Sequence, residues 1–293
     1  MIKHIVASLS ILLLSSAALC AEITPYGAFN YKYSHDENSS GVAYNKLEDN
    51  GSKIGLDFAE PSIEGSSIGA FAKLEVGVDT DDAASDTFDS RLAYVGLDLD
   101  IARVSVGRQS HPFTDNIGGK TSSFNVYGSS ADYNYASRSS QSIAVSSELS
   151  GFTVDTLGIV DGSSSNTDAF DEIEITVSAN LFGSDISVGW ADDVNNDISY
   201  WGVGGKTELG PLTVGSSYTI YDAATDKAAI EATAGYSIFT VGFGDRESTG
   251  SYYTGGVAKE IASGLTVYAE AEMADLDSGT DTTSYSLGTK YSF

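Results

Sequence analysis

The segment IEITVSANL, residues 173–181, decides the fold, because its side chains alternate strictly between apolar and polar. Ile173, Ile175 and Val177 begin one face, and Glu174 and Thr176 begin the other. Alternation with a period of two is typical of a β-strand, whereas a helix repeats about every 3.6 residues. The segment is therefore predicted to be a strand that separates an apolar from a polar environment.

The same alternation recurs along almost the whole chain. It is found in sixteen segments, at residues 23–33, 52–60, 66–78, 88–98, 101–108, 137–148, 152–161, 170–181, 185–192, 198–208, 212–221, 228–238, 239–247, 251–262, 264–274 and 283–293. Tight connections, as at Pro61 and Pro211, alternate with longer polar ones. Such alternation of turns and loops is typical of bacterial membrane barrels. The sequence therefore predicts an all-β, antiparallel up-and-down barrel, formed as one domain by residues 22–293.

Two architectures could use such strands, a soluble β-sandwich and a membrane barrel. The strands reach about ten residues, which is enough to cross hydrocarbon when they are tilted by about 45°. An even number of strands lets a barrel close without free edges. Aromatic side chains also gather towards strand ends on the apolar face, namely Phe29, Tyr31, Tyr33, Trp190, Trp201, Tyr291 and Phe293. Aromatic girdles of this kind favour the membrane barrel.

The first residues form a separate segment with the pattern of a secretory signal peptide. Lys3 and His4 precede the apolar run 5–14, which small residues follow. This run is shorter than the about 20 residues that a transmembrane helix needs. Residues 1–21 are expected to be cleaved after Cys20 or Ala21, which leaves a chain without cysteine and without disulfides.

The charge balance argues against nucleic-acid binding. The sequence has 15 basic and 41 acidic residues, and without residues 1–21, which contain Lys3, the net charge is 14 − 41 = −27. No nucleic-acid partner is expected, because such proteins neutralise phosphates with clustered cations. An acidic outer surface favours cations instead.

Candidates for catalysis and for metal binding are few. Beyond the signal peptide the only histidines are His35 and His111, and neither stands in a nucleophile motif, so no enzymatic activity is expected. The acidic clusters at 79–82 and 193–197 lack the glycine and distal glutamate of a calcium loop. We therefore expect neither a metal site nor a cofactor.

The chain ends on a strand with an aromatic last residue. Tyr285, Leu287, Tyr291 and Phe293 share one face of this strand. A terminal strand that ends on an aromatic residue resembles those of outer-membrane proteins. The resemblance implies that Phe293 is read by the barrel-insertion machinery.

Four stretches carry a more specific resemblance. They are SRLAYVGLDLD (90–100), VSVGRQSHPF (104–113), TPYGAFNYKY (24–33) and GTKYSF (288–293), and they resemble the Gram-negative general porins. The resemblance implies a sixteen-stranded homotrimer in the outer membrane, with each third loop folded into its barrel as a constriction. It implies a water-filled channel for passive diffusion of small hydrophilic solutes and ions. Outer-membrane lipid and lipopolysaccharide would surround it, and the acidic outer loops are expected to share divalent ions with the lipopolysaccharide.

The family resemblance also implies basic residues on the channel wall. Arg91 matches the arginine of the family's fourth strand, and its parity places it inward with Ala93 and Val95. Leu92 and Tyr94 are then expected to face outward.

Three further cations complete the expected basic wall. Lys53 stands where the family's second strand has an arginine, and the parity of Arg138 places it inward. Strict alternation groups Arg108 with the lipid side. Arg108 is expected to line the pore only because the strand is assumed to end by Gly107.

The third loop is expected from about Gln109 to Ala136. Asp115 is the candidate acid opposite the cations, with Lys120 as the second charged residue of the constriction. The neutral stretch 121–127 departs from the family pattern, so the transverse field is expected to be weaker or differently oriented.

Many other charged residues are also expected to face inward. They are Lys32, Lys73, Arg103, Lys206, Arg246, Lys290, Asp57, Glu75, Asp155, Glu174, Glu231, Glu270 and Glu272. These residues could form salt bridges along the wall, or they could line the pore and set its selectivity. The excess of acidic residues in the loops weakly favours a preference for cations. A substrate-selective porin and a closed structural or surface-binding barrel remain the alternatives to a general diffusion pore.

Overall fold

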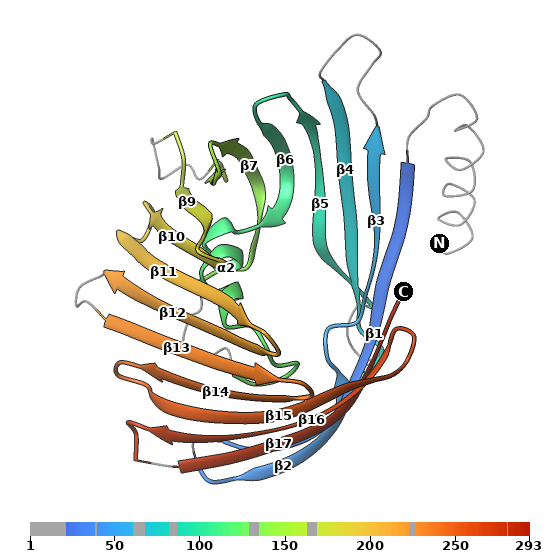
Figure 1. Cartoon of the computed structure of the whole chain (residues 1–293), viewed down its shortest axis with the longest axis vertical. Coiled ribbons are helices and arrows are strands. Elements are labelled where there is room, and N and C mark those ends of the chain that lie inside the picture. The colour runs from blue at the N-terminus through green and yellow to red at the C-terminus, as the bar shows by residue number, and fades with distance from the viewer. Residues whose placement is uncertain are drawn as a thin grey trace.

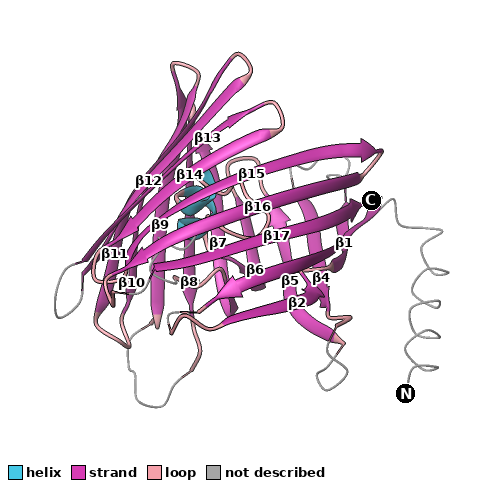
Figure 2. Cartoon of the chain, turned by 90° about the horizontal axis from the view of Figure 1, so that it is seen from below, coloured by secondary structure: helices cyan, strands magenta, loops and turns pink. Residues whose placement is uncertain are grey.

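The computed structural model describes residues 22–38, 40–60, 68–81, 87–128, 135–162, 169–222, 227–279 and 281–293. The strands in these ranges are β1 (Glu22–Glu37), β2 (Ala43–Asp49), β3 (Lys53–Glu60), β4 (Gly69–Val78), β5 (Phe88–Asp98), β6 (Arg103–Ser110), β7 (Arg138–Leu149), β8 (Phe152–Ile159), β9 (Glu172–Leu181), β10 (Ser184–Asp193), β11 (Ile198–Leu209), β12 (Leu212–Asp222), β13 (Lys227–Tyr236), β14 (Phe239–Arg246), β15 (Gly250–Ala262), β16 (Leu265–Leu276) and β17 (Asp281–Ser292). All belong to one antiparallel sheet, which closes because β1 pairs with β17 (Figures 1 and 2). The expected signal peptide and the turn at Pro61 lie outside the described residues.

The predicted closed barrel of sixteen strands is confirmed, with one extra strand. The first half of β1, from Glu22 to Ala28, pairs with β3, and its second half, from Tyr31 to Glu37, pairs with β2. β2 and β3 are thus two pieces of one barrel strand, separated by a break at Gly51, whose φ of +82° favours glycine. Sequence counting missed β2 because three of its seven residues are charged and no apolar face stands out.

The distribution of apolar side chains is the reverse of that in a soluble protein. Outward residues such as Val188 and Val241 are 51% and 60% exposed, whereas Glu174, Thr176 and Ser187 on the inner face are fully buried. A continuous apolar outer face needs lipid around it. Within the described ranges, no helix reaches the length and hydropathy required to span a membrane.

The C-terminal residue takes part in closing the barrel. The backbone N–H of Gly27 donates to the carbonyl oxygen of Phe293 at 3.0 Å, and the N–H of Phe293 donates back at 3.1 Å. A Cβ on Gly27 would lie 2.6 Å from the Phe293 ring, so only glycine leaves room for this aromatic side chain. The terminal Phe293 therefore packs directly against the first strand.

Candidate functional site in the lumen

The segment between β6 and β7 folds into the barrel, as the resemblance implied. It contains the short helix α2 (Pro112–Asn116) and the 3₁₀ turn η1 (Gly118–Lys120), and Figure 1 shows α2 inside the ring of strands. α2 lies against β8, β9 and β10, and η1 lies against β11 and β12. We call the described residues of this segment, 111–128 and 135–137, the third loop.

An apolar cluster fixes the start of the third loop. Phe113 and Ile117 are buried together with Tyr135 and Ala191, and Tyr200 packs against them. The rings of Phe113 and Tyr135 meet at 5.2 Å in an edge-on arrangement. This small core stands inside the polar lumen and holds α2 against the wall.

Glycines on the inner wall let the loop backbone approach the sheet. Those that face loop atoms are Gly189, Gly202, Gly204, Gly215, Gly242 and Gly256. A Cβ on Gly204 would lie 2.8 Å from the carbonyl oxygen of Ile117, and one on Gly215 would lie 2.1 Å from that of Lys120. Such close contact between backbones leaves no space for a side chain. We call these six residues the glycine track.

Wall carboxylates hold the loop by its backbone amides. Glu270 on β16 accepts hydrogen bonds from the N–H groups of Asn125, Val126 and Tyr127 at 2.6, 2.9 and 3.2 Å. On the same strand, Glu272 accepts one from the N–H of Gly128 at 3.0 Å. Each hydrogen bond to a charged group contributes about 1.5–3 kcal/mol to stability.

Other inward acids serve the same purpose. Thr121 donates to Glu231, and the side-chain amide of Asn116 donates to Asp155 at 2.9 Å. The sequence offered salt bridges or pore lining as interpretations of these acids. The structure adds a third role, because they accept hydrogen bonds from the loop.

Lys120 does not face the expected basic wall. Its side chain is buried, and its Nζ lies 2.6 Å from Oδ2 of Asp185 on β10. The expectation that Lys120 lines the constriction is therefore corrected, because the close approach of the loop to β11 and β12 turns this side chain towards the wall.

Three of the four expected wall cations do come together. The buried carboxylate of Glu75 accepts from Arg91 Nε at 2.7 Å, lies 2.9 Å from Lys53 Nζ and accepts from the Tyr26 hydroxyl at 3.0 Å. Arg138 interacts electrostatically with Arg91 and Glu75. We call Lys53, Arg91 and Arg138 the basic wall.

The inward position of Arg91 arises from a register shift rather than from simple parity. The pairing of β4 with β5 shifts between Glu75 and Val76, and Arg91 is the extra residue. A bulge of this kind reverses the parity of the strand beyond it. The expected orientations are therefore wrong for the neighbours, since Ala93 and Val95 are exposed on the outside while Leu92 and Tyr94 line an inner cavity.

Arg108 interacts electrostatically with Arg138 but forms no ion pair with Glu75. β6 does not end by Gly107, as was assumed, but continues to Ser110. Arg108 stands opposite the outward Ala93, and its guanidinium donates to the Ser90 carbonyl and the Ser140 hydroxyl, both at 3.1 Å. These hydrogen bonds hold the guanidinium group near the first residues of β5 and β7.

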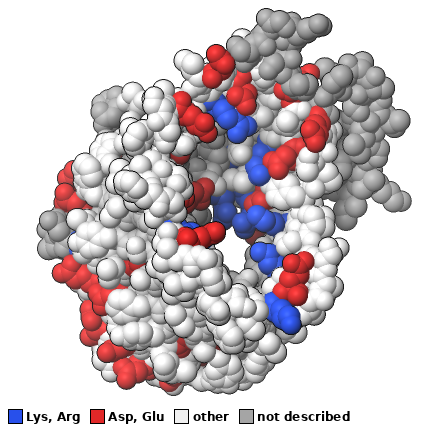
Figure 3. All heavy atoms as spheres, in the orientation of Figure 1, with Lys and Arg blue, Asp and Glu red and all other residues white. Residues whose placement is uncertain are grey.

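Asp115 on α2 is the loop acid that interacts with the basic wall. Its carboxylate is within electrostatic range of Arg138. Enclosure by the surrounding protein raises the pKa of Asp115 above its ordinary value, although the Ser110 hydroxyl, His111 and Arg138 act in the opposite direction. Figure 3 shows Lys and Arg side chains gathered along one side of the central opening.

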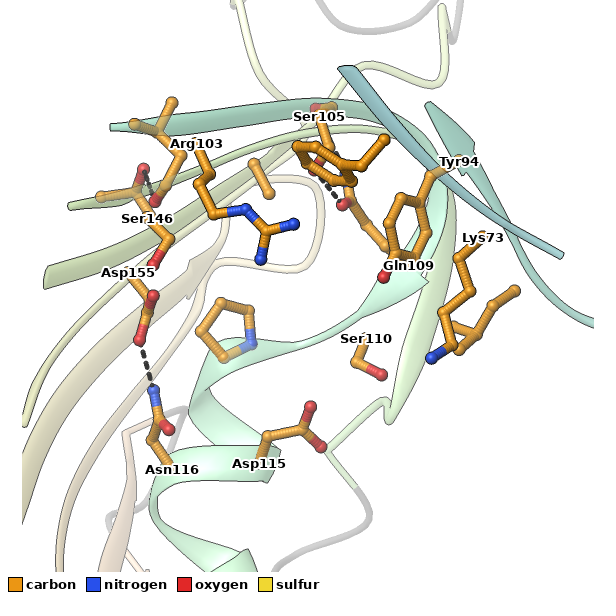
Figure 4. Close-up of a pocket in the computed structure, with 16 residues that line it drawn as sticks. Lys73, Tyr94, Arg103, Ser105, Gln109, Ser110, Asp115, Asn116, Ser146 and Asp155 are labelled. Carbon is orange, nitrogen blue, oxygen red and sulfur yellow. Dashed lines mark hydrogen bonds between the residues drawn. The ribbon is translucent and has the colours of Figure 1, made fainter. Parts of the chain in front are cut away.

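A cavity of about 390 Å³ lies between α2 and the wall formed by β4 to β8. Figure 4 shows Lys73 and Arg103 reaching into it from the wall and Asp115 from α2. The Arg103 guanidinium lies 4.1 Å from the centre of the Phe71 ring. The cavity therefore presents charges of both signs next to aromatic rings, and sequence parity gave no sign of it because Tyr94 was expected outside.

Comparisons with known proteins agree with this architecture. The family profile described as Gram-negative porin matches residues 7–293. No protein of curated function matches the chain in sequence. Among solved structures, a loop-deletion mutant of the outer-membrane protein OmpT of Vibrio cholerae is similar, with 17% identity and a TM-score of 0.74 over 93% of this chain and 99% of that one.

Two further solved structures share the fold. The anion-selective porin from Comamonas acidovorans has 14% identity and a TM-score of 0.74, over 93% of this chain and all (100%) of that one. OmpF of Salmonella typhi in complex with daunomycin has 15% identity and a TM-score of 0.72, over 92% of this chain and 97% of that one.

Proposed function

Since the chain belongs to the Gram-negative porin family and is an outer-membrane channel for passive diffusion of small hydrophilic solutes, we propose that the basic wall and Asp115 form its constriction. The observation that carries this proposal is the position of α2 inside the barrel, where Asp115 lines the cavity next to the cations of the wall. Opposed charges across a narrow pore orient dipolar solutes and penalise apolar ones.

The ion preference of the channel follows from two regions of opposite charge. Lys53 and Arg91 share the carboxylate of Glu75, and Arg138 adds a third positive charge, which leaves the basic wall positive. A second hollow presents Asp49, Asp79, Asp81 and Asp89 beside Arg91. We propose weak cation preference overall, because these acids and the excess of acidic residues outweigh the local positive charge.

The test is single-channel conductance in a planar bilayer, with reversal potentials in a salt gradient. Arg91→Ala removes one positive charge of the basic wall and should shift the reversal potential towards stronger cation preference. The matched control is Lys46→Ala, because Lys46 is an exposed cation on β2 outside the basic wall. A silent membrane despite verified insertion would contradict the diffusion pore and support the closed structural barrel.

The cavity beside α2 favours a second candidate, a substrate-selective porin. Arg103 and Tyr94 offer a cation and an aromatic ring to a solute with a carboxylate and an apolar part. Conductance that is blocked by such solutes, and restored by Arg103→Ala, would support this candidate. Equal permeation of unrelated solutes of one size would support the general pore.

Assembly and export complete the proposal. We propose a homotrimer, in line with the solved trimer form of OmpT from Vibrio cholerae, in contact with lipopolysaccharide. We also propose removal of residues 1–21 and recognition of Phe293 by the insertion machinery.

We propose no enzymatic role for this chain. Ser139, His111 and Glu174 are hydrogen-bonded in the order used by serine hydrolases, but His111 is fully buried.

A further inference from the structure

Four metal-ligating side chains converge at the root of the third loop. His111 and Tyr135 come from the two ends of the loop, and Glu172 and Glu174 come from β9. One ligand atom each from His111, Glu172 and Glu174 lie within 4.8 Å of one another. The Tyr135 hydroxyl donates to both carboxylates, at 2.7 Å in the case of Glu174.

Groups outside this cluster orient two of its members. Nε2 of His111 is hydrogen-bonded to the Ser139 hydroxyl at 2.7 Å, and Oε2 of Glu174 accepts from the backbone N–H of Phe113 at 2.9 Å. The second ring nitrogen of His111, Nδ1, and the second carboxylate oxygen of Glu174, Oε1, then face each other. Nδ1 also faces Glu172, and Oε1 faces Tyr135. Partners that fix the far side of each ligand are typical of metal centres in proteins.

The cluster also places two carboxylates next to each other and to one imidazole. His111 and Glu174 are fully buried and Glu172 is 14% exposed, so two carboxylates stand side by side away from bulk water. Among the described residues, no Lys or Arg lies within 4.0 Å of either one. Tyr135 has a single hydroxyl proton for two acceptors. One divalent cation would neutralise both carboxylates at once.

We propose that His111, Glu172, Glu174 and Tyr135 form a binding site for a divalent first-row transition metal ion, with Zn²⁺ as the best match. One imidazole nitrogen and two carboxylate oxygens suit Zn²⁺, which takes four ligands at about 2.0–2.2 Å in a tetrahedron. The Tyr135 oxygen or a water supplies the fourth ligand. The metal takes the place of the proton between Nδ1 and Oε1, which is released to solvent, while Nε2 of His111 keeps its own proton and donates it to Ser139.

The proposed metal site is connected to the constriction by the helix α2. The helix starts directly after His111, and the backbone N–H of Asp115 donates to the carbonyl oxygen of His111 at 3.0 Å. A metal that joins both ends of the loop to β9 therefore fixes the helix that carries Asp115. Bound Zn²⁺ should raise the melting temperature and reduce fluctuations of the open-channel current.

The test is calorimetric titration of the EDTA-treated, folded protein with ZnCl₂, and it uses protein without a histidine tag. Excess Mg²⁺ in the buffer occupies the exposed carboxylates, because Mg²⁺ prefers oxygen ligands. We expect one Zn²⁺ per chain, and the absorption spectrum of tetrahedral Co²⁺ when cobalt replaces zinc. His111→Gln and Glu172→Gln should weaken binding by at least about 10–100-fold.

His35→Gln is the matched control, because His35 is the other histidine beyond the expected signal peptide and bonds Asn45 at an exposed position on β1. It should bind Zn²⁺ like the wild type. Glu172→Gln, at the less buried edge of the cluster, keeps the test valid where His111→Gln does not fold. No stoichiometric Zn²⁺ binding by the wild type, or unchanged binding by folded Glu172→Gln, would overturn the proposal.

Discussion

Glu75 Oε1 accepts a hydrogen bond from Arg91 Nε at 2.7 Å, while its Oε2 lies 2.9 Å from Lys53 Nζ. One buried carboxylate thus positions two cations that come from different strands. The basic wall depends on this carboxylate for its geometry, and so does the charge that the lumen presents.

Replacement of Glu75 tests this dependence. Glu75→Gln removes the negative charge that pairs with Lys53 and Arg91, so the wall becomes more positive and anions should permeate better. Reversal potentials in a salt gradient measure the shift. Asp57→Asn is the control, since Asp57 pairs with Lys73 outside this group, at 3.0 Å. Equal shifts in both variants would contradict a special role for Glu75.

The selectivity should also depend on pH through Asp115. Its pKa lies above the ordinary value of 3.8, so its charge is lost at a higher pH than that of a free aspartate. As the pH falls through this raised pKa, the constriction loses a negative charge and cation preference should decrease. Measured reversal potentials of Asp115→Asn should lack this step, and a step that persists in the variant would assign it to another group.

The glycine track predicts which substitutions displace the loop. Gly215→Ala places a Cβ 2.1 Å from the carbonyl oxygen of Lys120, so the loop backbone must move away from β12. Overpacking of this kind costs about 1–3 kcal/mol, and the displaced loop should change the conductance. Gly205→Ala is the control, because its Cβ would meet nothing within 4 Å. Identical melting curves and conductance in both variants would refute the close approach.

The anchoring role of Glu270 can be measured as stability and as current noise. Glu270→Gln weakens three charge-assisted hydrogen bonds from the loop backbone, and the expected loss is about 1.5–3 kcal/mol or more. Thermal unfolding measures the loss of stability, and open-channel noise measures the increased motion of the loop. The exposed Glu208 supplies the control Glu208→Gln, which should leave both unchanged.

Much of the wall could be predicted because alternation is a local property. At Ile173 and Glu174 the sequence assigns the correct faces, since neighbouring side chains of a strand always point to opposite sides. The same rule gives the wrong faces at Leu92 and Tyr94, because a bulge at Arg91 depends on how β5 pairs with β4. A one-residue shift in pairing is invisible in a single strand.

The sequence alone predicts that this chain closes into an outer-membrane barrel, because period-two patterning and an apolar outer face are local properties of each strand. The position of the third loop depends on the tertiary structure. Glu270 and Asn125 are 145 residues apart, and Gly215 on the inner wall meets the backbone of Lys120 in the loop. Contacts between such distant residues follow from the closure of the sheet, which brings facing walls and the enclosed loop together irrespective of their order in the chain.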